Sequence, residues 1–271
     1  MGVQTMQKPK MLLPDLKDKV AVVTGAGSGI GRAAALMLAQ QGMKVCLADL
    51  KDERRDQTVQ EILSTGGQAI SVDVDVADPI RVAEAFEEVA HAWGRLDFVF
   101  ANAGINGVLA PIEDMKPEDW DRTLSVNLKG TFLCVKHAVP HMKEQGGSIV
   151  ITSSINGSRK FSGFGMSAYS ASKAGQVAFA KMAALELARY KIRVNAICPG
   201  SIKTNIGENT QPTPELQKIK IPVNYPEGSQ PLEHAPGMPE QVADLVAFLA
   251  SEASSHITGT ELFIDGAESL L

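Results

Sequence analysis

Short apolar runs alternate with amphipathic stretches along most of the chain, and this pattern predicts its secondary structure. The runs are rich in β-branched residues and end at turn-forming residues, which is typical of buried strands. We expect strands at residues 20–25, 44–49, 68–75, 96–101, 147–152, 192–198 and 260–265. The stretches between them have apolar residues at helical spacing. We expect helices at residues 29–41, 53–63, 79–94, 117–142, 167–190 and 239–250.

Strands and helices that alternate at this length are typical of a parallel sheet with helices on both faces. Right-handed crossovers then determine most of the topology. The chain has 271 residues, with no internal repeat and no low-complexity linker. We therefore predict an α/β fold with a doubly wound parallel sheet, in one domain over residues 16–271. Residues 1–15 form an N-terminal extension in this prediction.

One segment interrupts the alternation of strands and helices. Residues 199–239 contain no long periodic stretch, and they include several prolines. A long loop in a compact domain is either a surface excursion or a functional element. We favour a lid over a substrate, at about residues 203–238, which we call the lid segment. Its scattered apolar residues could cover a substrate; they are Ile206, Leu216, Ile219, Val223 and Leu232.

Composition and charge exclude several classes of function. Apolar residues make up 44% of the chain, which excludes a disordered or collagen-like protein. The net charge of -5 argues against nucleic acid as the main partner, because phosphate binding needs a basic face. We expect no membrane partner, since no apolar run approaches the ~20 residues of a spanning helix. The N-terminus does not resemble a secretory signal, and three scattered cysteines do not form a disulfide framework, so we expect a cytoplasmic protein.

A glycine-rich turn, TGAGSGIG at residues 24–31, joins the first strand to the first helix. Gly25, Gly29 and Gly31 allow a tight turn and a close approach of backbone N–H groups to phosphate oxygens. A pyrophosphate bound there would meet the positive end of the helix. The spacing differs from the commoner G-x-G-x-x-G pattern, but its place between a strand and a helix favours a dinucleotide.

The second strand ends in Asp49, which bears on the choice of dinucleotide. A carboxylate there can accept hydrogen bonds from both adenosine ribose hydroxyls and would repel a 2′-phosphate. Neither Ser28 nor Leu50 is a cation that could neutralise that phosphate. We therefore predict that NAD is preferred and NADP is possible. A solvated strand-end residue is the alternative interpretation of Asp49.

Further turns follow the third and fourth strands, at Asp75 and Val76 and at the ANAG motif of residues 101–104. The small residues after Asn102 would let a dinucleotide cross the sheet edge. Ligands of open α/β sheets bind at the carboxyl ends of the strands, so these turns are expected to meet in one crevice.

A possible catalytic group lies in the YSASK motif, where Tyr169 and Lys173 are four residues apart on one helix face. A neighbouring ammonium would lower the pKa of the phenol and make it usable near neutral pH. A hydroxyl after the fifth strand, from Ser154 or its rival Ser153, could bond a substrate oxygen. Asn127 is disfavoured in a helix interior, which suggests a local disturbance or a water-binding role.

In these motifs the chain resembles the short-chain dehydrogenases/reductases: TGAGSGIG, ANAG, Asn127, the serine pair, YSASK, and the PG pair that begins at Pro199. The resemblance covers about residues 16–266. It implies a seven-stranded Rossmann sheet and hydride transfer between NAD(P) and a small-molecule alcohol or carbonyl substrate. It also implies dimers or tetramers built through the two long helices.

The resemblance implies a catalytic tetrad of Asn127, Ser154, Tyr169 and Lys173, and it is what selects Ser154 over Ser153. In this scheme Asn127 holds a water that links Lys173 to solvent, Lys173 also bonds the nicotinamide ribose, and Thr204 meets the carboxamide. The expected cofactor contacts are Gly25, Ser28, Gly29, Ile30, Gly31, Asp49, Leu50, Asp75, Val76, Asn102, Ala103, Gly104, Tyr169, Lys173, Pro199, Gly200, Ile202 and Thr204.

The chain departs from the family pattern in two places. Ala101 stands where the family often has asparagine. The segment at residues 155–168 is somewhat longer than usual and carries Arg159 and Lys160. These two cations could meet an anionic substrate, or they could be a solvated pair.

Other signals point away from a metal or a cysteine nucleophile. His137 and His141 have a spacing that can bind zinc, but no further ligand pattern accompanies them and a proline lies between them, so we expect no metal. Cys134 and Cys198 lie in predicted element interiors and are expected to be buried.

We predict a secondary-alcohol dehydrogenase or carbonyl reductase with Tyr169 as the acid/base. The alternatives are an NADPH-dependent 3-oxoacyl-thioester reductase, a sugar dehydrogenase, and a dinucleotide-binding sensor or scaffold without turnover. The complete tetrad argues against the sensor.

Overall fold

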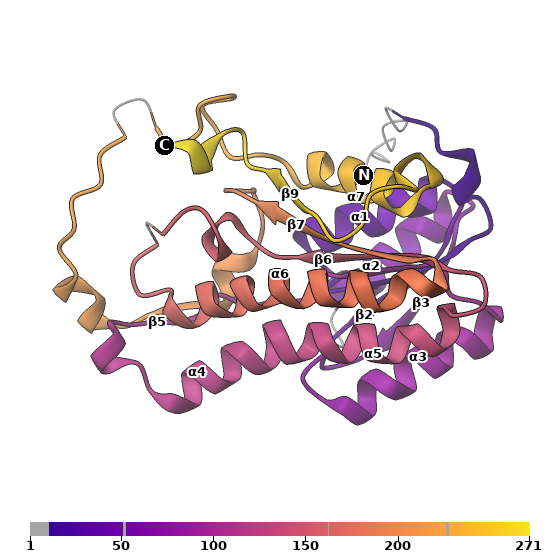
Figure 1. Cartoon of the computed structure of the whole chain (residues 1–271), viewed down its shortest axis with the longest axis horizontal. Coiled ribbons are helices and arrows are strands. Elements are labelled where there is room, and N and C mark those ends of the chain that lie inside the picture. The colour runs from indigo at the N-terminus through magenta and orange to yellow at the C-terminus, as the bar shows by residue number, and fades with distance from the viewer. Residues whose placement is uncertain (1–10, 51–52, 162, 226–227) are drawn as a thin grey trace.

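The computed structural model describes residues 11–50, 53–161, 163–225 and 228–271. A seven-stranded parallel sheet forms its centre, in the order β3-β2-β1-β4-β6-β7-β9 (Figure 1). The strands are β1 (Val20–Thr24), β2 (Lys44–Asp49), β3 (Gln68–Asp73), β4 (Phe98–Ala101), β6 (Gly147–Thr152), β7 (Ile192–Pro199) and β9 (Glu261–Ile264). The predicted doubly wound α/β sheet is therefore confirmed.

Helices cover both faces of the sheet and form two apolar cores. The helices are α1 (Gly29–Gln40), α2 (Glu53–Ser64), α3 (Pro79–Trp93), α4 (Pro117–Leu124), α5 (Gly130–Met142), α6 (Ser167–Leu187) and α7 (Pro239–Ala250). Helices α1, α2 and α7 pack their apolar residues against one face. Helices α3, α5 and α6 pack against the other. Burial on both faces explains why the central strands are nearly continuous apolar runs.

The strand order reverses at β1, and this reversal places the site. β1 pairs with β2 on one side and with β4 on the other, so the chain crosses the sheet in opposite directions from this point. Crossovers that diverge from one strand leave a crevice at its carboxyl end. The turns after β1, β2 and β4 all open at this end.

The helix predicted at residues 117–142 is interrupted. Helices α4 and α5 are joined by a π-helical turn, η3 (Ser125–Lys129), with Asn127 inside it. The main-chain oxygen of Asn127 accepts hydrogen bonds from Thr131 Oγ1 at 2.8 Å and Gln176 Nε2 at 2.9 Å. Two side-chain donors therefore bond this main-chain oxygen within the π-helical turn. The local disturbance expected at Asn127 is present.

Two strand boundaries differ from the prediction by two residues, and side chains explain both. β3 ends at Asp73 because Asp75 Oδ1 accepts a hydrogen bond from the Ala77 N–H, which bends the chain toward α3. β4 begins at Phe98 rather than at residue 96. The N–H of Val20 on β1 donates to the Asp97 carboxylate at 2.9 Å, so a side chain holds this end of the pair.

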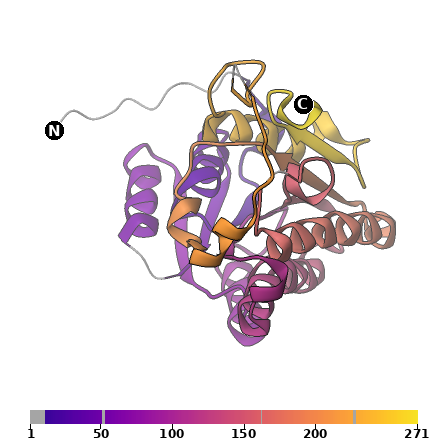
Figure 2. The same cartoon turned by 90° about the vertical axis from the view of Figure 1, so that its left-hand side faces the viewer.

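The lid segment contains short elements that the sequence pattern does not predict. β8 (Thr210–Pro212) pairs in parallel with β5 (Gly107–Leu109), and η6 (Ile206–Asn209) and η7 (Pro214–Lys218) flank β8. Figure 2, which faces the carboxyl end of the sheet, shows this orange segment lying across that end. Of the apolar residues expected to cover a substrate, Ile206, Val223 and Leu232 are all exposed, and Ile206 lines the cavity described below.

The predicted N-terminal extension is partly incorporated into the fold, and residues 1–10 of it lie outside the described residues. Leu13 and Leu16 are buried against α1 and its neighbours, around the short helix η1 (Pro14–Leu16). The N–H of Leu13 donates to Gln41 Oε1 at 2.9 Å. Across the part of the chain that the structure describes, no helix is both long enough and apolar enough to cross a membrane.

Candidate active site

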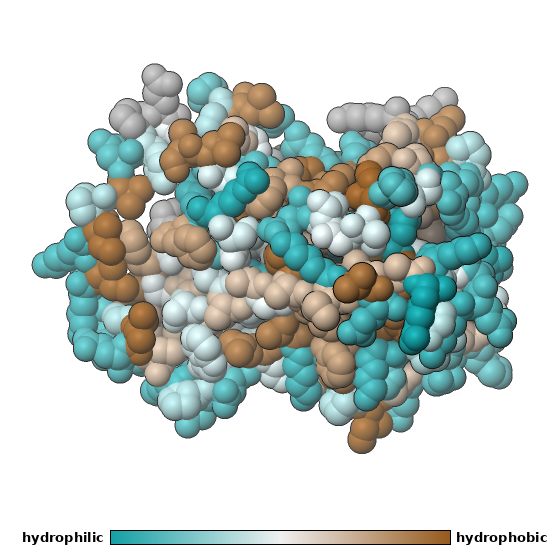
Figure 3. All heavy atoms as spheres, in the orientation of Figure 1, coloured by the Kyte–Doolittle hydropathy of each residue, from teal (hydrophilic) through white to brown (hydrophobic). Residues whose placement is uncertain are grey.

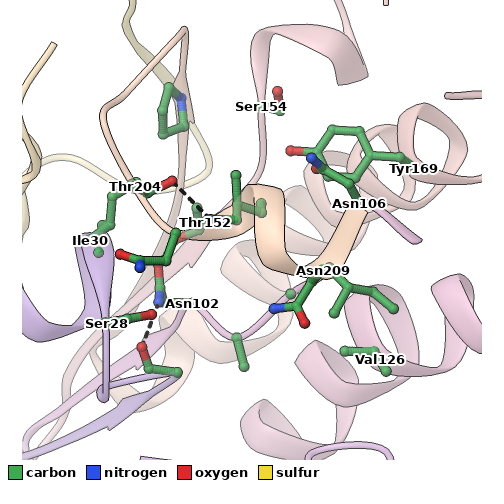
Figure 4. A pocket seen from close by; sticks show the side chains of 18 of the residues that line it. Ser28, Ile30, Asn102, Asn106, Val126, Thr152, Ser154, Tyr169, Thr204 and Asn209 are labelled. Atoms are coloured by element: carbon green, nitrogen blue, oxygen red, sulfur yellow. Dashed lines mark hydrogen bonds between the residues drawn. The ribbon is translucent and has the colours of Figure 1, made fainter. Parts of the chain in front are cut away.

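A cavity of about 800 Å³ opens at the carboxyl end of the sheet. Ser28 and Ile30 lie at one end of it and Ser154 and Tyr169 at the other, with Asn102 between them (Figure 4). The predicted site residues that line it are Gly25, Ser28, Gly29, Ile30, Asp49, Leu50, Asp75, Val76, Asn102, Ala103, Gly104, Ser154, Tyr169, Lys173, Pro199, Gly200, Ile202 and Thr204. Two predicted residues, Gly31 and Asn127, lie behind this lining.

The glycine-rich turn brings α1 against β1. A Cβ atom on Gly31 would lie 2.0 Å from the Gly25 main-chain oxygen, so only glycine fits there. Gly29 has a φ of +51° and packs against Thr204, whose side chain would lie 3.1 Å from a Cβ atom on Gly29. Ser28, the N-cap of α1, makes no side-chain cap. The first N–H groups of α1 can therefore bind an anion in the cavity.

The Asp49 carboxylate closes the end of the glycine-rich turn. Its Oδ2 accepts a hydrogen bond from the Gly27 N–H at 2.7 Å, and its Oδ1 accepts one from the Leu50 N–H at 2.8 Å. Arg54, on α2, also lines the cavity and pairs with Glu208 of η6 at 2.9 Å. This ion pair joins the lid segment to the opposite wall.

The Asn102 side chain connects the ends of three strands. Its Nδ2 donates to the Thr24 main-chain oxygen at 3.1 Å, and its Oδ1 accepts from Thr152 Oγ1 at 3.0 Å. The Thr24 hydroxyl in turn accepts the N–H groups of Asn102 and Ala103 at 2.9 and 3.1 Å. β1, β4 and β6 are therefore held in register where a ligand would cross them.

Tyr169 is buried near the start of α6, with its side chain directed into the cavity (Figure 4). Burial raises the pKa of its phenol, and a hydrogen bond with Ser154 lowers it by less. The net direction is therefore opposite to the lowered pKa that the sequence predicts, because desolvation is the largest contribution. The phenol is protonated at neutral pH and is ready to donate a proton.

Lys173 lies one helical turn after Tyr169 and is equally buried. Burial lowers the pKa of its ammonium from 10.5 to about 8. Its Nζ donates a hydrogen bond to the Thr152 main-chain oxygen at 2.8 Å and lies 5.5 Å from the centre of the Tyr169 ring. The ammonium therefore sits between the end of β6 and the phenol.

The two serines after β6 have different surroundings. Ser153 Oγ donates to the Lys173 main-chain oxygen at 2.8 Å, which anchors α6 to the sheet. Ser154 Oγ accepts a hydrogen bond from the Asn156 N–H at 3.1 Å and points into the cavity beside Tyr169 (Figure 4). This geometry favours Ser154 as the hydroxyl that meets a substrate.

Asn127 is fully buried and holds the loop after β4. Its Oδ1 accepts the Ile105 N–H at 2.8 Å, and its Nδ2 donates to the Ile105 oxygen and to Ser172 Oγ, both at 2.9 Å. A Cβ on Gly104 would lie 3.1 Å from Asn127 Oδ1 and 3.5 Å from Lys173 Nζ. Asn127 and Lys173 therefore flank the same glycine.

The charged pair at residues 159 and 160 does not offer a free anion site. The Arg159 guanidinium lies 3.5 Å above the Phe263 ring centre, although the residue is exposed. Lys160 is buried and pairs with Glu268 at 3.0 Å. Both predicted interpretations are wrong for Lys160, because a carboxylate that is distant in sequence neutralises it.

Neither the histidine pair nor the cysteines form a second reactive site. His141 faces Glu87 at 3.4 Å, and the described part of the chain has no cluster of three or more side chains that could hold a metal. The three cysteines are free and buried. Burial raises the pKa of Cys134 to about 12 and that of Cys198 to about 11, so both are thiols at neutral pH.

Several lining residues escape the sequence prediction. Thr152 holds both Asn102 and Lys173, and its place as the last residue of a strand is a signal that could have identified it. Asn106 lies beside Tyr169 (Figure 4) and donates to Thr210 Oγ1 at 2.9 Å. Glu268, near the C-terminus, also lines the cavity. Nothing local in the sequence places it there.

Comparisons with known proteins agree with this geometry. A family model described as enoyl-(acyl carrier protein) reductase matches residues 25–267. The chain is 40% identical to a 3-oxoacyl-(acyl-carrier-protein) reductase of Thermotoga maritima, covering 93% of this chain and 98% of that protein. It is 38% identical to a cyclohexanol dehydrogenase of Acinetobacter sp., covering 95% and 98%.

Solved structures show the same likeness. A 3-ketoacyl-ACP reductase from Sinorhizobium meliloti 1021 has a TM-score of 0.88 and 46% identity, covering 93% of this chain and 99% of that one. Levodione reductase has a TM-score of 0.82 and 33% identity, covering 94% and 98%. The chain belongs to the short-chain dehydrogenases/reductases. It is an oxidoreductase that transfers a hydride between NAD(P) and an alcohol or carbonyl group.

The packing of the glycine-rich turn gives a first prediction. Replacing Gly31 by Ala forces its Cβ against the Gly25 oxygen, so α1 must move away from β1. We expect the Kd for NADH, measured by fluorescence titration, to rise by about tenfold or more. Gly207→Ala is the matched control, because a Cβ there meets nothing within 4 Å. Equal affinity of the two variants would contradict the role given to Gly31.

Proposed function

We propose that this protein is an NAD-preferring oxidoreductase of secondary alcohols and ketones, with Tyr169 as the group that donates or accepts the proton. The observation that carries the proposal is the meeting of Ser154, Tyr169 and Lys173 at one end of a cavity whose other end is a glycine-rich turn. A dinucleotide bound with its pyrophosphate at the glycine-rich turn would present its nicotinamide ring to these three side chains. The cavity is therefore suited to a reaction rather than to binding alone.

The residues at the glycine end fit a dinucleotide. Gly29 lines the cavity at the start of α1, Gly31 lets that helix pack closely against Gly25, and the helix end favours an anion. The bound dinucleotide supplies or accepts the hydride. Asp49 supports NAD, because it lines the cavity beside the glycine-rich turn, where its carboxylate would repel a 2′-phosphate.

The protein side chains at the other end handle the proton. In carbonyl reduction, Ser154 bonds the substrate oxygen and the neutral phenol of Tyr169 donates its proton to that oxygen. The Lys173 ammonium lies close enough to stabilise the phenolate that forms. Asn127 fixes the loop at Ile105, which lines the cavity. In alcohol oxidation each proton movement is reversed.

A second candidate is a 3-oxoacyl-thioester reductase that uses NADPH. Its support is the similarity to two reductases of acyl-carrier-protein thioesters, from Thermotoga maritima and Sinorhizobium meliloti. The cyclohexanol dehydrogenase and levodione reductase support the alcohol and ketone substrates instead. Asp49 favours the first candidate, since it disfavours the phosphate of NADPH.

The proposal is tested by comparing the native enzyme with Tyr169→Phe. A panel of cyclic and open-chain alcohols, ketones, sugars and 3-oxoacyl thioesters is assayed with NAD(H) and with NADP(H), following the nicotinamide absorbance. We expect turnover with ketones or secondary alcohols and NAD(H), and a loss of about 10²- to 10⁴-fold in kcat in the variant, because the proton donor is gone. The Kd for NADH should stay nearly unchanged.

Tyr190→Phe is the matched control, since Tyr190 lies beyond the end of α6 under the side chains of Lys143 and Arg189. It should keep native turnover. Full activity of Tyr169→Phe would refute the proton-transfer role. Turnover confined to thioesters and NADPH would favour the second candidate.

The lowered pKa of Lys173 predicts a pH dependence. Its ammonium is present below about pH 8 and is lost as the pH rises through that value. We therefore expect kcat/KM for ketone reduction to fall above about pH 8, by up to about tenfold per pH unit. Lys173→Arg, whose guanidinium stays charged, should lose this decline, whereas the exposed Lys181→Met should keep it. A native profile that is level up to about pH 10 would contradict the assignment.

We also propose that the protein is cytoplasmic and forms a homodimer or homotetramer through α5 and α6. Phe132, Met182 and Leu185 on these helices are 44%, 57% and 74% exposed. Apolar side chains reach the surface over this face of the molecule (Figure 3). Exposed apolar residues that gather on two neighbouring helices support an interface between copies.

The mass in solution tests the proposed assembly. We expect sedimentation to give two or four times the 28.9 kDa of one chain. Leu185→Asp should shift the protein toward smaller species, because a charge would be buried at the interface. Leu63→Asp, at an exposed residue of α2, should not. A native mass of one chain would refute the assembly.

A further inference from the structure

We propose that Glu268 is a positioning residue that fixes the shape of the substrate end of the cavity. One buried carboxylate joins the segment after Ser154, the loop after β7, and the lid segment. The inference rests on the proposed function, because it takes the end of the cavity near Tyr169 as the place of the substrate. Glu268 itself lies in the short C-terminal helix η9 (Glu268–Leu270).

Three hydrogen bonds converge on the Glu268 carboxylate. Oε1 accepts from Lys160 Nζ at 3.0 Å. Oε2 accepts from the Ser201 N–H at 2.7 Å and from Gln230 Nε2 at 2.6 Å. Glu268 and Lys160 are each 8% exposed and Gln230 is 9% exposed. The donors are thus drawn from three separate segments into one site that solvent scarcely reaches.

Each donor belongs to a different segment of the chain, and these segments also supply lining residues of the cavity, namely Ile155, Ser201 and Ile206. The N–H of Lys160 donates to the Ile155 oxygen at 3.0 Å, and Ile155 directly follows Ser154. Ser201 follows the PG pair, and its main-chain oxygen accepts the Gly237 N–H at 2.9 Å. Gln230 lies in the lid segment. Movement of any one of these three segments therefore changes the position of the Glu268 carboxylate and the hydrogen bonds that it makes with the other two.

The C-terminal turn is built to hold this carboxylate in place. The Asp265 side chain accepts the N–H of Ala267 at 3.2 Å and that of Ser269 at 2.9 Å, so it brackets Glu268 on both sides. These two bonds hold the main chain on either side of Glu268. The yellow C-terminal turn consequently lies beside the orange lid segment in both Figure 1 and Figure 2.

Charge balance makes Lys160 and Glu268 dependent on each other. A buried ion pair contributes little net stability, but removing one partner leaves an uncompensated buried charge. Lys160 Nζ also lies 4.8 Å from the centre of the Tyr225 ring, so a second lid residue contacts the pair. The pair therefore makes the position of the lid segment specific without offering a free charge to the substrate.

The glycine end of the cavity is independent of this cluster. Asp49 and the start of α1 make none of the hydrogen bonds that converge on Glu268. Loss of the carboxylate should therefore weaken substrate binding more than dinucleotide binding, which it reaches through the Ser201 N–H alone among these bonds. It should also let the lid segment open more often, whether or not a substrate is present.

The test compares Glu268→Leu, Lys160→Met/Glu268→Leu and Lys160→Met/Glu268→Gln with the native protein. The apolar double variant removes both charges, so it should be less destabilised than Glu268→Leu alone, which leaves the buried Lys160 ammonium unpaired, judged by their melting temperatures. It still lacks the acceptor for Ser201 and Gln230. We expect its KM for a ketone to rise about tenfold or more, kcat and the Kd for NADH to change less than about threefold, and amide hydrogen exchange of residues 203–238 to quicken.

The glutamine double variant is the conservative rescue. Its amide oxygen can still accept the Ser201 N–H, so its KM and its lid exchange should lie closer to the native values than those of the leucine double variant. Glu261→Leu is the matched control. It removes an ion pair to Lys181 at 2.6 Å on the neighbouring strand β9, outside the cavity, and should alter neither KM nor lid exchange.

Two results would overturn the proposal. One is a leucine double variant whose lid exchange and KM match those of Glu261→Leu. The other is a rise in KM that follows the melting temperature and disappears whenever stability is restored. Hydrogen exchange of the lid segment needs no turnover, so it decides the positioning role even if every substrate in the panel fails and the proposed function falls.

Discussion

The reversal of strand order at β1 is the constraint on which the rest of the structure depends. It creates the crevice, and the side chains of Thr24, Asn102 and Thr152 keep the three strands at its base in register. Thr152 also connects these strands to the reactive side chains, because its main-chain oxygen accepts a hydrogen bond from the Lys173 ammonium. A topological feature of the sheet and the placement of a reactive helix are therefore parts of one hydrogen-bonded system.

Burial sets the electrostatics of the reactive groups. It raises the pKa of Tyr169 and lowers that of Lys173, so both changes oppose the charged form. Both groups therefore act against the same desolvated environment, because the phenol must form a charge during reduction and the ammonium must keep one. The bonds from Lys173 to Thr152 and from Ser154 to the phenol supply part of that support from within the chain.

Elements and motifs that act through local spacing could be predicted from the sequence, and contacts across the fold could not. The glycine-rich turn and the Tyr169–Lys173 pair depend on neighbours a few residues away, so their pattern is visible in the chain. The disturbance at Asn127 was predictable from helix propensity, although its π-helical form was not. Lys160 was misjudged because Glu268 lies 108 residues further along. The β5–β8 pair likewise depends on a loop geometry that no apolar period encodes.

The two ends of the cavity are closed by ion pairs of opposite character. Arg54 and Glu208, at the dinucleotide end, are about half exposed, whereas Lys160 and Glu268 are almost completely enclosed. Dissolved salt screens an exposed pair and scarcely reaches an enclosed one. Ionic strength should therefore act on the entrance at the dinucleotide end and leave the shape of the opposite end unaltered. Salt should therefore change how readily the dinucleotide enters and leaves, whereas it should leave the shape of the substrate end unchanged.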